Sequence, residues 1–318
     1  MSSAVDAVSP PLPDAEPRAR TVARTAKSWL ALLRPLHWSK NAFVFAPFLF
    51  TEWAQSTENF LRASACFAQF CLLASAVYLL NDVLDAAADR RHPRKCRRPI
   101  AAGDVAPTTA LAVALAFCVI ALLWSYGLRK ASLAAAGLYL ANGVVYTLWF
   151  KHHVLVDVLS ISIGFLLRLL GGCAAIGAEP SSWLLVCGFS VSLFLGFGKR
   201  RTEIEGLNGG EDFRSVLRDY SREKLDTVLA ITAALSLLSY MLFTTAPETV
   251  ERHRSNRLVF TTVFVAYGLF RYLFKVQEGK GDGPTDVLGK DPVFFLNGLL
   301  WAGSVYFILH VLPNWFPP

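Results

Sequence analysis

Long runs of apolar residues constrain this chain more than any other feature of its sequence. Each run has roughly 17 to 25 residues, the length at which an α-helix crosses the hydrocarbon core of a bilayer. Hydrophobic residues make up 54% of the chain and charged residues only 17%, whereas about a quarter of a typical soluble domain is charged. The sequence therefore predicts an all-α, polytopic membrane protein.

Nine segments have the character of membrane-spanning helices. The predicted spans cover residues 41–55, 63–80, 108–126, 131–149, 154–177, 182–198, 225–245, 257–274 and 292–312. Residues 21–40 interleave basic residues with Trp and Leu, a pattern typical of an amphipathic helix in the membrane interface. Residues 1–27 are rich in Ala, Pro and charge and predict a disordered cytoplasmic tail, so that 28–318 form the integral membrane domain.

The distribution of Lys and Arg predicts how the chain is oriented. With the N-terminus inside, the inner segments hold 24 of the 31 basic residues and the outer loops hold six. Such a bias marks the cytoplasmic side. It places the two long polar connections, 81–107 and 199–224, on that side, so we expect a site that faces the cytoplasm from the inner (cytoplasmic) membrane.

Other functional classes fit the composition poorly. A net charge of +7 could suggest nucleic-acid binding, but the basic residues here separate apolar runs and do not form a surface on a soluble scaffold. The six cysteines contain no CxxC pair, which argues against a zinc site or a disulfide framework. Transporters often show internal repeats, and we find no convincing repeat. A homo-oligomer is compatible with the sequence.

An acidic motif begins where the second predicted span ends. Residues 81–89 read Asn-Asp-Val-Leu-Asp-Ala-Ala-Ala-Asp, so that Asp82, Asp85 and Asp89 project from one face of a helix. Three carboxylates this close repel each other unless a cation lies among them, and hard oxygen ligands suit Mg²⁺. The alternative is a solvated helix end that forms salt bridges with the following arginines. The full spacing, with Asn81, favours a Mg²⁺–diphosphate site.

A basic cluster follows directly, and Arg97 and Arg98 precede Pro99 within it. Guanidinium groups bind phosphate in bidentate fashion, so a polyanionic ligand could bridge the acidic and basic groups. Orientation in the membrane explains such a cluster equally well. Both interpretations apply, and we expect Arg97 or Arg98 to touch substrate because Pro99 fixes the chain there.

The fifth predicted span carries two charged side chains on one face, Asp157 and Arg168. Ionisable groups inside a span normally face the bundle interior or a wet cavity. Eleven residues of helix rise about 16 Å, too far for the two to pair, so each needs another partner. For Arg168 the partner could be a polar substrate or a side chain of another helix.

The second long polar connection opens with Lys199, Arg200 and Glu203. Lys199 and Glu203 could form a simple i,i+4 helix pair. Alternatively, the two basic residues bind phosphate while Glu203 binds ribose hydroxyls or metal. His152 and His153 have no obvious partner and are not expected to be metal ligands.

Together these motifs resemble the UbiA superfamily of intramembrane prenyltransferases. Asn81-Asp82-x-x-Asp85-x-x-x-Asp89, followed by Arg98-Pro99-Ile100-x-x-Gly103, is similar to the first signature of that superfamily. The resemblance covers about residues 30–312. It implies a helical fold around a central cavity, a diphosphate bound through Mg²⁺ on Asp-rich motifs, and lateral entry of lipid tails from the bilayer.

Other segments resemble the decaprenyl-phosphate phosphoribosyltransferase branch. They are Arg34-Pro35-x-x-Trp38-x-Lys40-Asn41, Leu148-x-x-Lys151-His152-x-x-x-x-Asp157, Gly164-Phe165-x-x-Arg168 and Gly198-Lys199-Arg200-x-x-Glu203. Most aromatic prenyltransferases of the superfamily carry a second Asp-rich motif near the sixth span, where this chain is basic with glutamates only. This departure weakens the aromatic-acceptor alternative and leaves the ligands of a second Mg²⁺ open.

The resemblance implies transfer of 5-phosphoribosyl from phosphoribosyl diphosphate to a polyprenyl phosphate, a reaction of cell-envelope biosynthesis, with Mg²⁺ as cofactor. The acceptor phosphate is already anionic, so no general base is required. We predict Asp82, Asp85 and Asp157 as catalytic residues and Asp82, Asp85 and Asp89 as metal ligands. The predicted substrate-binding residues are Arg34, Lys40, Asn81, Arg97, Arg98, Lys151, Arg168, Lys199, Arg200 and Glu203. The alternative enzyme activity is prenyl transfer from a polyprenyl diphosphate to an aromatic acceptor.

Overall fold

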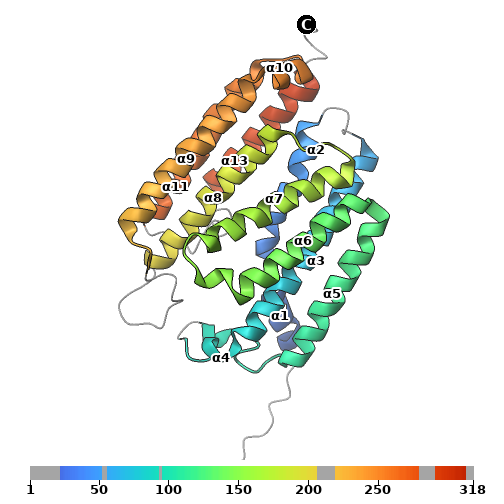
Figure 1. The fold of residues 1–318 in the computed structure, drawn as a ribbon, viewed down its shortest axis with the longest axis vertical. Helices are drawn as coiled ribbons and strands as arrows, with labels where there is room; N and C mark the ends of the chain where they lie inside the picture. The colour runs from blue at the N-terminus through green and yellow to red at the C-terminus, as the bar shows by residue number, and fades with distance from the viewer. Residues whose placement is uncertain (1–21, 52–55, 93–94, 206–218, 279–290, 313–318) are drawn as a thin grey trace, which may run out of the picture.

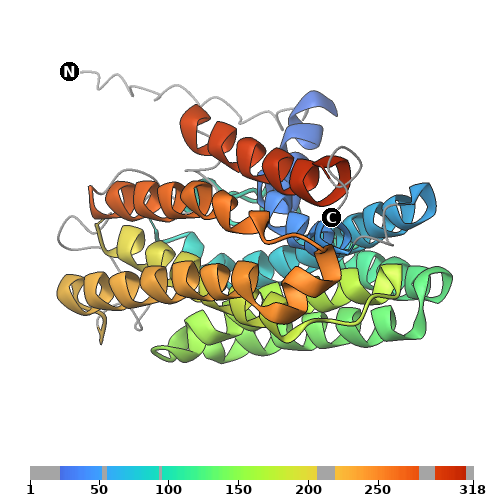
Figure 2. The same ribbon diagram turned by 90° about the horizontal axis from the view of Figure 1, so that it is seen from above.

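The computed structural model describes residues 22–51, 56–92, 95–205, 219–278 and 291–312. These residues form helices and turns, and no strand occurs among them. Residues 1–21 of the predicted tail, residues 52–55 of the first predicted span, and residues 93–94, 206–218 and 279–290 lie outside the described residues. Figures 1 and 2 show the helices running side by side along the molecule. The predicted all-α class is confirmed.

Eight helices are long and apolar enough to cross a membrane, counted over the described residues. Each contains or closely matches one predicted span. Their bounds are α3 Thr57–Leu84, α5 Pro107–Leu128, α6 Lys130–Leu148, α7 Val156–Ile176, α8 Ser182–Glu205, α9 Arg222–Thr245, α11 Thr262–Gln277 and α13 Pro292–Tyr306. Two of these are extended by short turns, η6 (Arg257–Thr261) before α11 and η7 (Phe307–Val311) after α13.

The segment around the first predicted span, 41–55, is built differently. The chain runs as α1 (Val22–Leu33), then a 3₁₀ helix η1 (Pro35–Phe45), then the short α2 (Ala46–Phe50). Helix α1 ends at Leu33 because Pro35 disfavours the α conformation of Arg34, which takes φ +52°. Figure 1 shows this broken segment running from the end of the bundle near α4 (Ala86–Asp89) to the opposite end. It accompanies the eight long helices along the bundle, consistent with about nine crossing segments.

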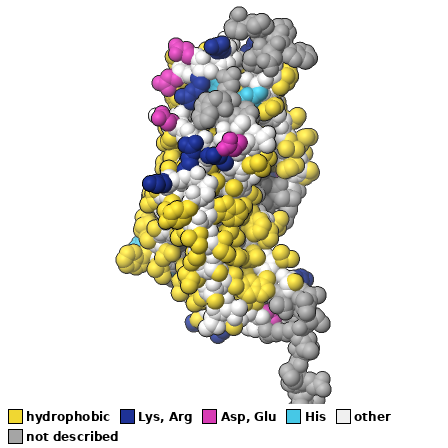
Figure 3. Space-filling view, turned by 90° about the vertical axis from the view of Figure 1, so that its right-hand side faces the viewer, with side chains coloured by type: hydrophobic (Ala, Val, Ile, Leu, Met, Phe, Trp, Pro, Cys, Tyr) yellow, Lys and Arg dark blue, Asp and Glu magenta, His cyan; other side chains and the backbone are white. Residues whose placement is uncertain are grey.

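The best-buried helices lie at the centre of the molecule. In the spanning windows of α7 and α3, 67% and 56% of the residues are buried, against 11% for α13 and 17% for α5. Figure 3 shows hydrophobic side chains across a broad band of the face in view, with charged side chains beyond it. This distribution is expected of helices whose outer faces contact lipid, so polar residues on α3 and α7 lie inside the bundle.

The 3₁₀ helix η1 packs closely against α7, one of the most buried helices of the bundle. A Cβ at Gly172 of α7 would lie 2.2 Å from the backbone oxygen of Val44, so only glycine permits this approach. On the α3 side, the Trp38 indole N–H donates to Ser75 Oγ at 3.1 Å, and that hydroxyl donates to the carbonyl of Leu33 at 3.0 Å. These contacts place Arg34 beside the end of α3.

Candidate functional site

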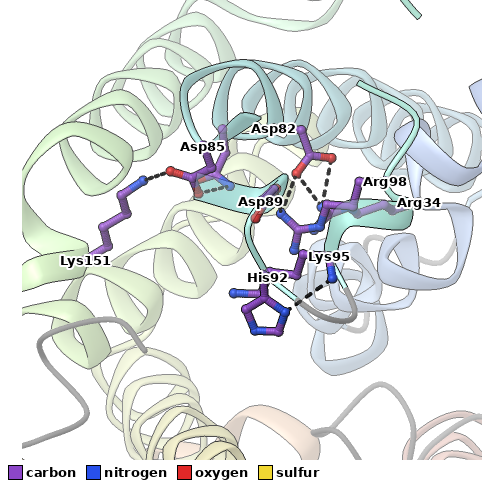
Figure 4. A network of polar contacts seen from close by, with 9 residues as sticks. Arg34, Asp82, Asp85, Asp89, His92, Lys95, Arg98 and Lys151 are labelled. Atoms are coloured by element: carbon purple, nitrogen blue, oxygen red, sulfur yellow. Dashed lines mark hydrogen bonds and ion pairs between the residues drawn. The ribbon is translucent and has the colours of Figure 1, made fainter. Parts of the chain in front are cut away.

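The three aspartates of the acidic motif lie at the junction of α3 and α4. Asp82 is in the last turn of α3, Asp85 follows its end, and Asp89 closes α4. Asp82 and Asp89 are buried, with 2% and 4% of their surface exposed. Both bind one guanidinium nitrogen, Arg98 Nη1, at 3.1 and 2.7 Å. Asp82 on α3 and Asp89 on α4 therefore share one cation, whereas Asp85 turns to a different partner (Figure 4).

Asp82 also forms an ion pair with a second arginine, Arg34, which lies between α1 and η1. Arg34 Nη2 donates to both Asp82 oxygens, at 2.6 and 2.9 Å. The Arg34 guanidinium lies over the Tyr78 ring at 5.0 Å, a cation–π contact one turn earlier on α3. Because Arg34 is left-handed at the α1–η1 junction, its side chain reaches α3 and neutralises the most buried carboxylate of the motif.

Asp85 pairs with the turn between α6 and α7. Lys151 lies in the short 3₁₀ helix η4 (Phe150–His152), and its Nζ is 2.6 Å from Asp85 Oδ1. Asn81 Nδ2 donates to the other oxygen of Asp85 at 3.0 Å. Lys151 is buried, so its charge needs this carboxylate or another anion. Figure 4 shows the two groups of contacts on either side of α4.

The carboxylates do not converge on one point in this structure. No group of three or more His, Cys, Asp or Glu side chains is placed to hold a metal among the described residues. The donor set nevertheless fits Mg²⁺, because one positive atom, Arg98 Nη1, already contacts an oxygen of Asp82 and an oxygen of Asp89. Mg²⁺ uses one or two carboxylates and completes its shell with water and phosphate oxygens. Asp82 and Asp89 are the residues that fit this role.

A second charged cluster joins α7 and α8. Asp157, in the first turn of α7, and Arg200 of α8 are both fully buried. Arg200 Nε is 2.5 Å from Asp157 Oδ2, an ion pair that is not aligned as a hydrogen bond. Arg200 also pairs with Glu203 and donates to the Tyr146 hydroxyl at 3.2 Å. Asp157 and Arg200 therefore neutralise each other inside the bundle.

Lys199 and Lys40 lie between the two clusters. Lys199 Nζ is 3.7 Å from Glu203 Oε1, the predicted i,i+4 pair. Lys40 and Lys199 are electrostatic neighbours of each other and of His37 on η1. His37 in turn packs edge-on against Tyr78, at 5.5 Å between ring centroids. Positive charge thus extends from the aspartate helix end to the end of α8.

Arg168 lies deeper in the bundle, where its donors meet protein acceptors. Its Nε donates to Asn41 Oδ1 at 2.6 Å, Nη1 to the Gly164 carbonyl at 2.7 Å, and Nη2 to the Tyr139 hydroxyl at 2.8 Å. The geometry favours the structural alternative for Arg168, a link between η1, α6 and α7. The expectation that Arg168 and Asp157 have separate partners is confirmed.

The basic connection contributes one of its two predicted ligands to the aspartate cluster. Arg98, after the short 3₁₀ helix η3 (Lys95–Arg97), reaches the acidic residues, while Arg97 is exposed. Ile100 packs with Leu32 and Leu79 in a core cluster, which holds the connection against α1 and α3. Pro99 precedes this anchor, so the chain direction at Arg98 is fixed.

Several tyrosines outside the predicted set of site residues contact its charged side chains. Tyr78, Tyr139 and Tyr146 bind the guanidinium groups of Arg34, Arg168 and Arg200, and Tyr220 binds Asp157. Their common signal is a tyrosine inside or next to an apolar run near a predicted charged residue. That signal is weak, because tyrosine also anchors membrane interfaces.

Comparison with known proteins shows the same fold and similar sequences. A model of the UbiA prenyltransferase family matches residues 42–299. A UbiA homolog from Archaeoglobus fulgidus, solved with GPP and Mg²⁺, superposes with a TM-score of 0.68, covering 89% of this chain and 100% of that one at 18% identity.

Two curated relatives are named decaprenyl-phosphate phosphoribosyltransferase. The protein from Mycolicibacterium smegmatis is 28% identical over 303 residues, covering 92% of this chain and 95% of that protein. The protein from Corynebacterium glutamicum is 31% identical over 296 residues, covering 91% and 88%. The likeness thus extends over nearly the whole of each chain.

Proposed function

The chain belongs to the UbiA prenyltransferase family, and on that basis we propose that it transfers 5-phosphoribosyl from phosphoribosyl diphosphate to a polyprenyl phosphate. The carrying observation is the similarity, over more than nine-tenths of this chain, to relatives named decaprenyl-phosphate phosphoribosyltransferase. The reaction forms a bond between an acceptor phosphate oxygen and the anomeric carbon, while the bond from that carbon to diphosphate breaks.

The charge distribution supports two phosphate-bearing substrates. Three basic side chains, Arg34, Arg98 and Lys151, bind the aspartates directly, and Lys40 and Lys199 lie nearby. Arg34 and Arg98 pair with Asp82 and Asp89, the carboxylates that would hold Mg²⁺, and guanidinium groups also bind phosphate oxygens, so both arginines are placed to contact a diphosphate bound there. A prenyl diphosphate donor with an aromatic acceptor brings one phosphate-bearing substrate instead of two and needs fewer cations.

The chain's residues act by positioning and by charge. Asp82 and Asp89 would hold Mg²⁺, which would supply positive charge against the departing diphosphate. Arg98 and Lys151 orient the donor phosphates, and Lys199 and Lys40 receive the acceptor phosphate. Holding the two reactants together removes the entropy of their encounter. No proton needs to be abstracted, because the acceptor is a phosphate anion.

We further propose that the site faces the cytoplasm from the cytoplasmic membrane. The connections that carry Asp85, Lys151 and Lys199 meet at one end of the bundle (Figure 1). The segments at this end hold most of the Lys and Arg of the sequence, as the inner side of a membrane protein does. Phosphoribosyl diphosphate, a soluble anion, would reach the site from that side.

The test is product analysis with purified protein in detergent and lipid. Labelled phosphoribosyl diphosphate and decaprenyl phosphate are incubated with Mg²⁺ or with EDTA, and the lipid fraction is analysed by mass spectrometry. We expect a phosphoribosyl lipid only with Mg²⁺. In a parallel reaction, a polyprenyl diphosphate and an aromatic acid are supplied. A prenylated aromatic product without ribosyl lipid would overturn the proposal in favour of prenyl transfer.

A further inference from the structure

The Tyr220 hydroxyl hydrogen-bonds both to Asp157 of α7 and to the backbone of Leu155, just before α7. Tyr220 lies just before α9, and its ring is buried among Val158 of α7, Phe194 of α8 and Leu225 of α9. Its hydroxyl donates to Asp157 Oδ1 at 2.9 Å and accepts the backbone N–H of Leu155 at 2.8 Å. One hydroxyl therefore fixes two residues of the segment that leads into α7.

Leu155 has an unusual backbone conformation. It takes φ +66° and ψ −42° immediately before α7, and it is one of three non-glycine residues with positive φ among those the structure describes. A bulky residue in this region is strained, and such strain persists only where surrounding contacts hold it. The Leu155 side chain is half exposed, so little packing holds it there. The bond to Tyr220 is the contact that fixes its N–H.

The strained residue lies between two ion pairs of the site. Four residues before it, Lys151 reaches Asp85 at 2.6 Å. Two residues after it, Asp157 reaches Arg200 at 2.5 Å. A change of backbone direction at Leu155 would move Lys151 relative to α7, because only residues 152–154 separate Lys151 from Leu155 along the chain. The direction of the chain at Leu155 therefore sets where Lys151 can reach.

We propose that Tyr220 is a positioning residue, whose hydroxyl holds the Leu155 turn and thereby places Lys151 on Asp85. The effect of Tyr220 on the reaction rate rests on the proposed function, in which Lys151 binds a phosphate of the donor. Burial, reinforced by the Asp157 carboxylate, raises the pKa of Tyr220 above its usual value, so the hydroxyl keeps its proton at the pH of any assay.

The experiment compares Tyr220→Phe with Tyr240→Phe. Tyr240 is a matched control, because its buried hydroxyl also makes two hydrogen bonds, with Thr261 at 2.7 Å and Trp301 at 2.9 Å, but at a different packing contact. Two quantities are measured on full-length protein: the yield of Lys151–Asp85 cross-link formed by a zero-length carbodiimide reagent, quantified by mass spectrometry, and kcat/KM for phosphoribosyl diphosphate. Thermal unfolding is recorded for both variants.

For Tyr220→Phe we expect a cross-link yield about fivefold lower and a kcat/KM about tenfold lower, the size of effect expected when a charged group is misplaced. For Tyr240→Phe both stay within about twofold of the original protein. Adding Leu155→Gly to Tyr220→Phe should restore most of the cross-link, because glycine adopts positive φ without strain. A role limited to core packing would not be rescued in this way.

Unchanged cross-linking in Tyr220→Phe, or no recovery on adding Leu155→Gly, would overturn the positioning role. The cross-link needs no substrate, so it separates this inference from the proposed function. If the original protein cross-links but forms no phosphoribosyl lipid, the proposed function fails while the cross-link still decides the role of Tyr220.

Discussion

Lys151 Nζ lies 2.6 Å from Asp85 Oδ1, although 66 residues separate the two along the chain. Asp85 follows the end of α3, and Lys151 lies in η4 between α6 and α7. Their contact joins the end of α3 to the turn between α6 and α7. The consequences of this arrangement can be tested residue by residue.

Replacing Asp82 removes the carboxylate that binds both arginines. We expect Asp82→Asn to lower the rate of phosphoribosyl transfer roughly 100-fold or more, since electrostatic groups at a reacting centre have effects of that size. Lipid product is measured across a Mg²⁺ titration. The control is Glu58→Gln, which breaks an exposed ion pair with Arg62 on α3 and should leave the rate unchanged. Full activity of Asp82→Asn would contradict the metal assignment.

Arg34 should not be replaceable by lysine. Its guanidinium reaches both Asp82 oxygens and also lies over Tyr78, and lysine cannot do both. Losing a charge-assisted contact of about 1.5–3 kcal/mol corresponds to a roughly 10- to 100-fold lower kcat/KM for Arg34→Lys. Steady-state kinetics with phosphoribosyl diphosphate as the varied substrate measures it. A lysine variant with the original kcat/KM would show that the paired geometry is dispensable.

The buried pair of Asp157 and Arg200 should matter for stability as a unit. Asp157→Asn leaves the Arg200 charge without its buried partner, a change that costs about 3–5 kcal/mol in buried pairs. We expect a clear fall in the thermal unfolding temperature in detergent. The double variant Asp157→Asn with Arg200→Met should lose less than the sum of the single variants. Additive losses would argue that the two charges do not interact.

Gly172 should tolerate no side chain. A Cβ there would lie 2.2 Å from the Val44 backbone oxygen, and backbone cannot move aside as a flexible side chain can. We expect Gly172→Ala to displace η1 and lower both the folded yield and the activity. Gly137→Ala is the control, because a Cβ in that α6 position meets nothing within 4 Å. Size-exclusion profiles and unfolding temperatures of the two variants would show whether they differ.

His253 should make the protein less stable at mildly acidic pH. It is buried on α10 (Pro247–His253), and burial, with Arg252 and His310 nearby, lowers its pKa from 6.5 to about 4. The unfolded chain binds this proton below pH 6.5 and the folded chain only below about 4. Stability should therefore fall as pH drops through that window. Unfolding temperatures measured from pH 7.5 to 4 should fall less for His253→Gln, whereas His153→Gln, at an exposed position, should follow the original protein.

The sequence determined the membrane character and eight of the crossing helices. These follow from composition and period, because twenty apolar residues in a row have few alternatives to a helix in lipid. The spacing of Asp82, Asp85 and Asp89 likewise predicted an acidic helix end, since position along a helix fixes direction.

Tertiary structure decided which charges meet. Asp85 turns to Lys151 while Asp82 and Asp89 share Arg98, a choice set by how α3, α6 and the basic connection pack. The broken path of η1 and the hydrogen-bond partners of Arg168 and Tyr220 depend equally on contacts between distant segments. Spacing along one helix reveals which side chains share a face, but a partner on another helix is known only once the helices are packed together.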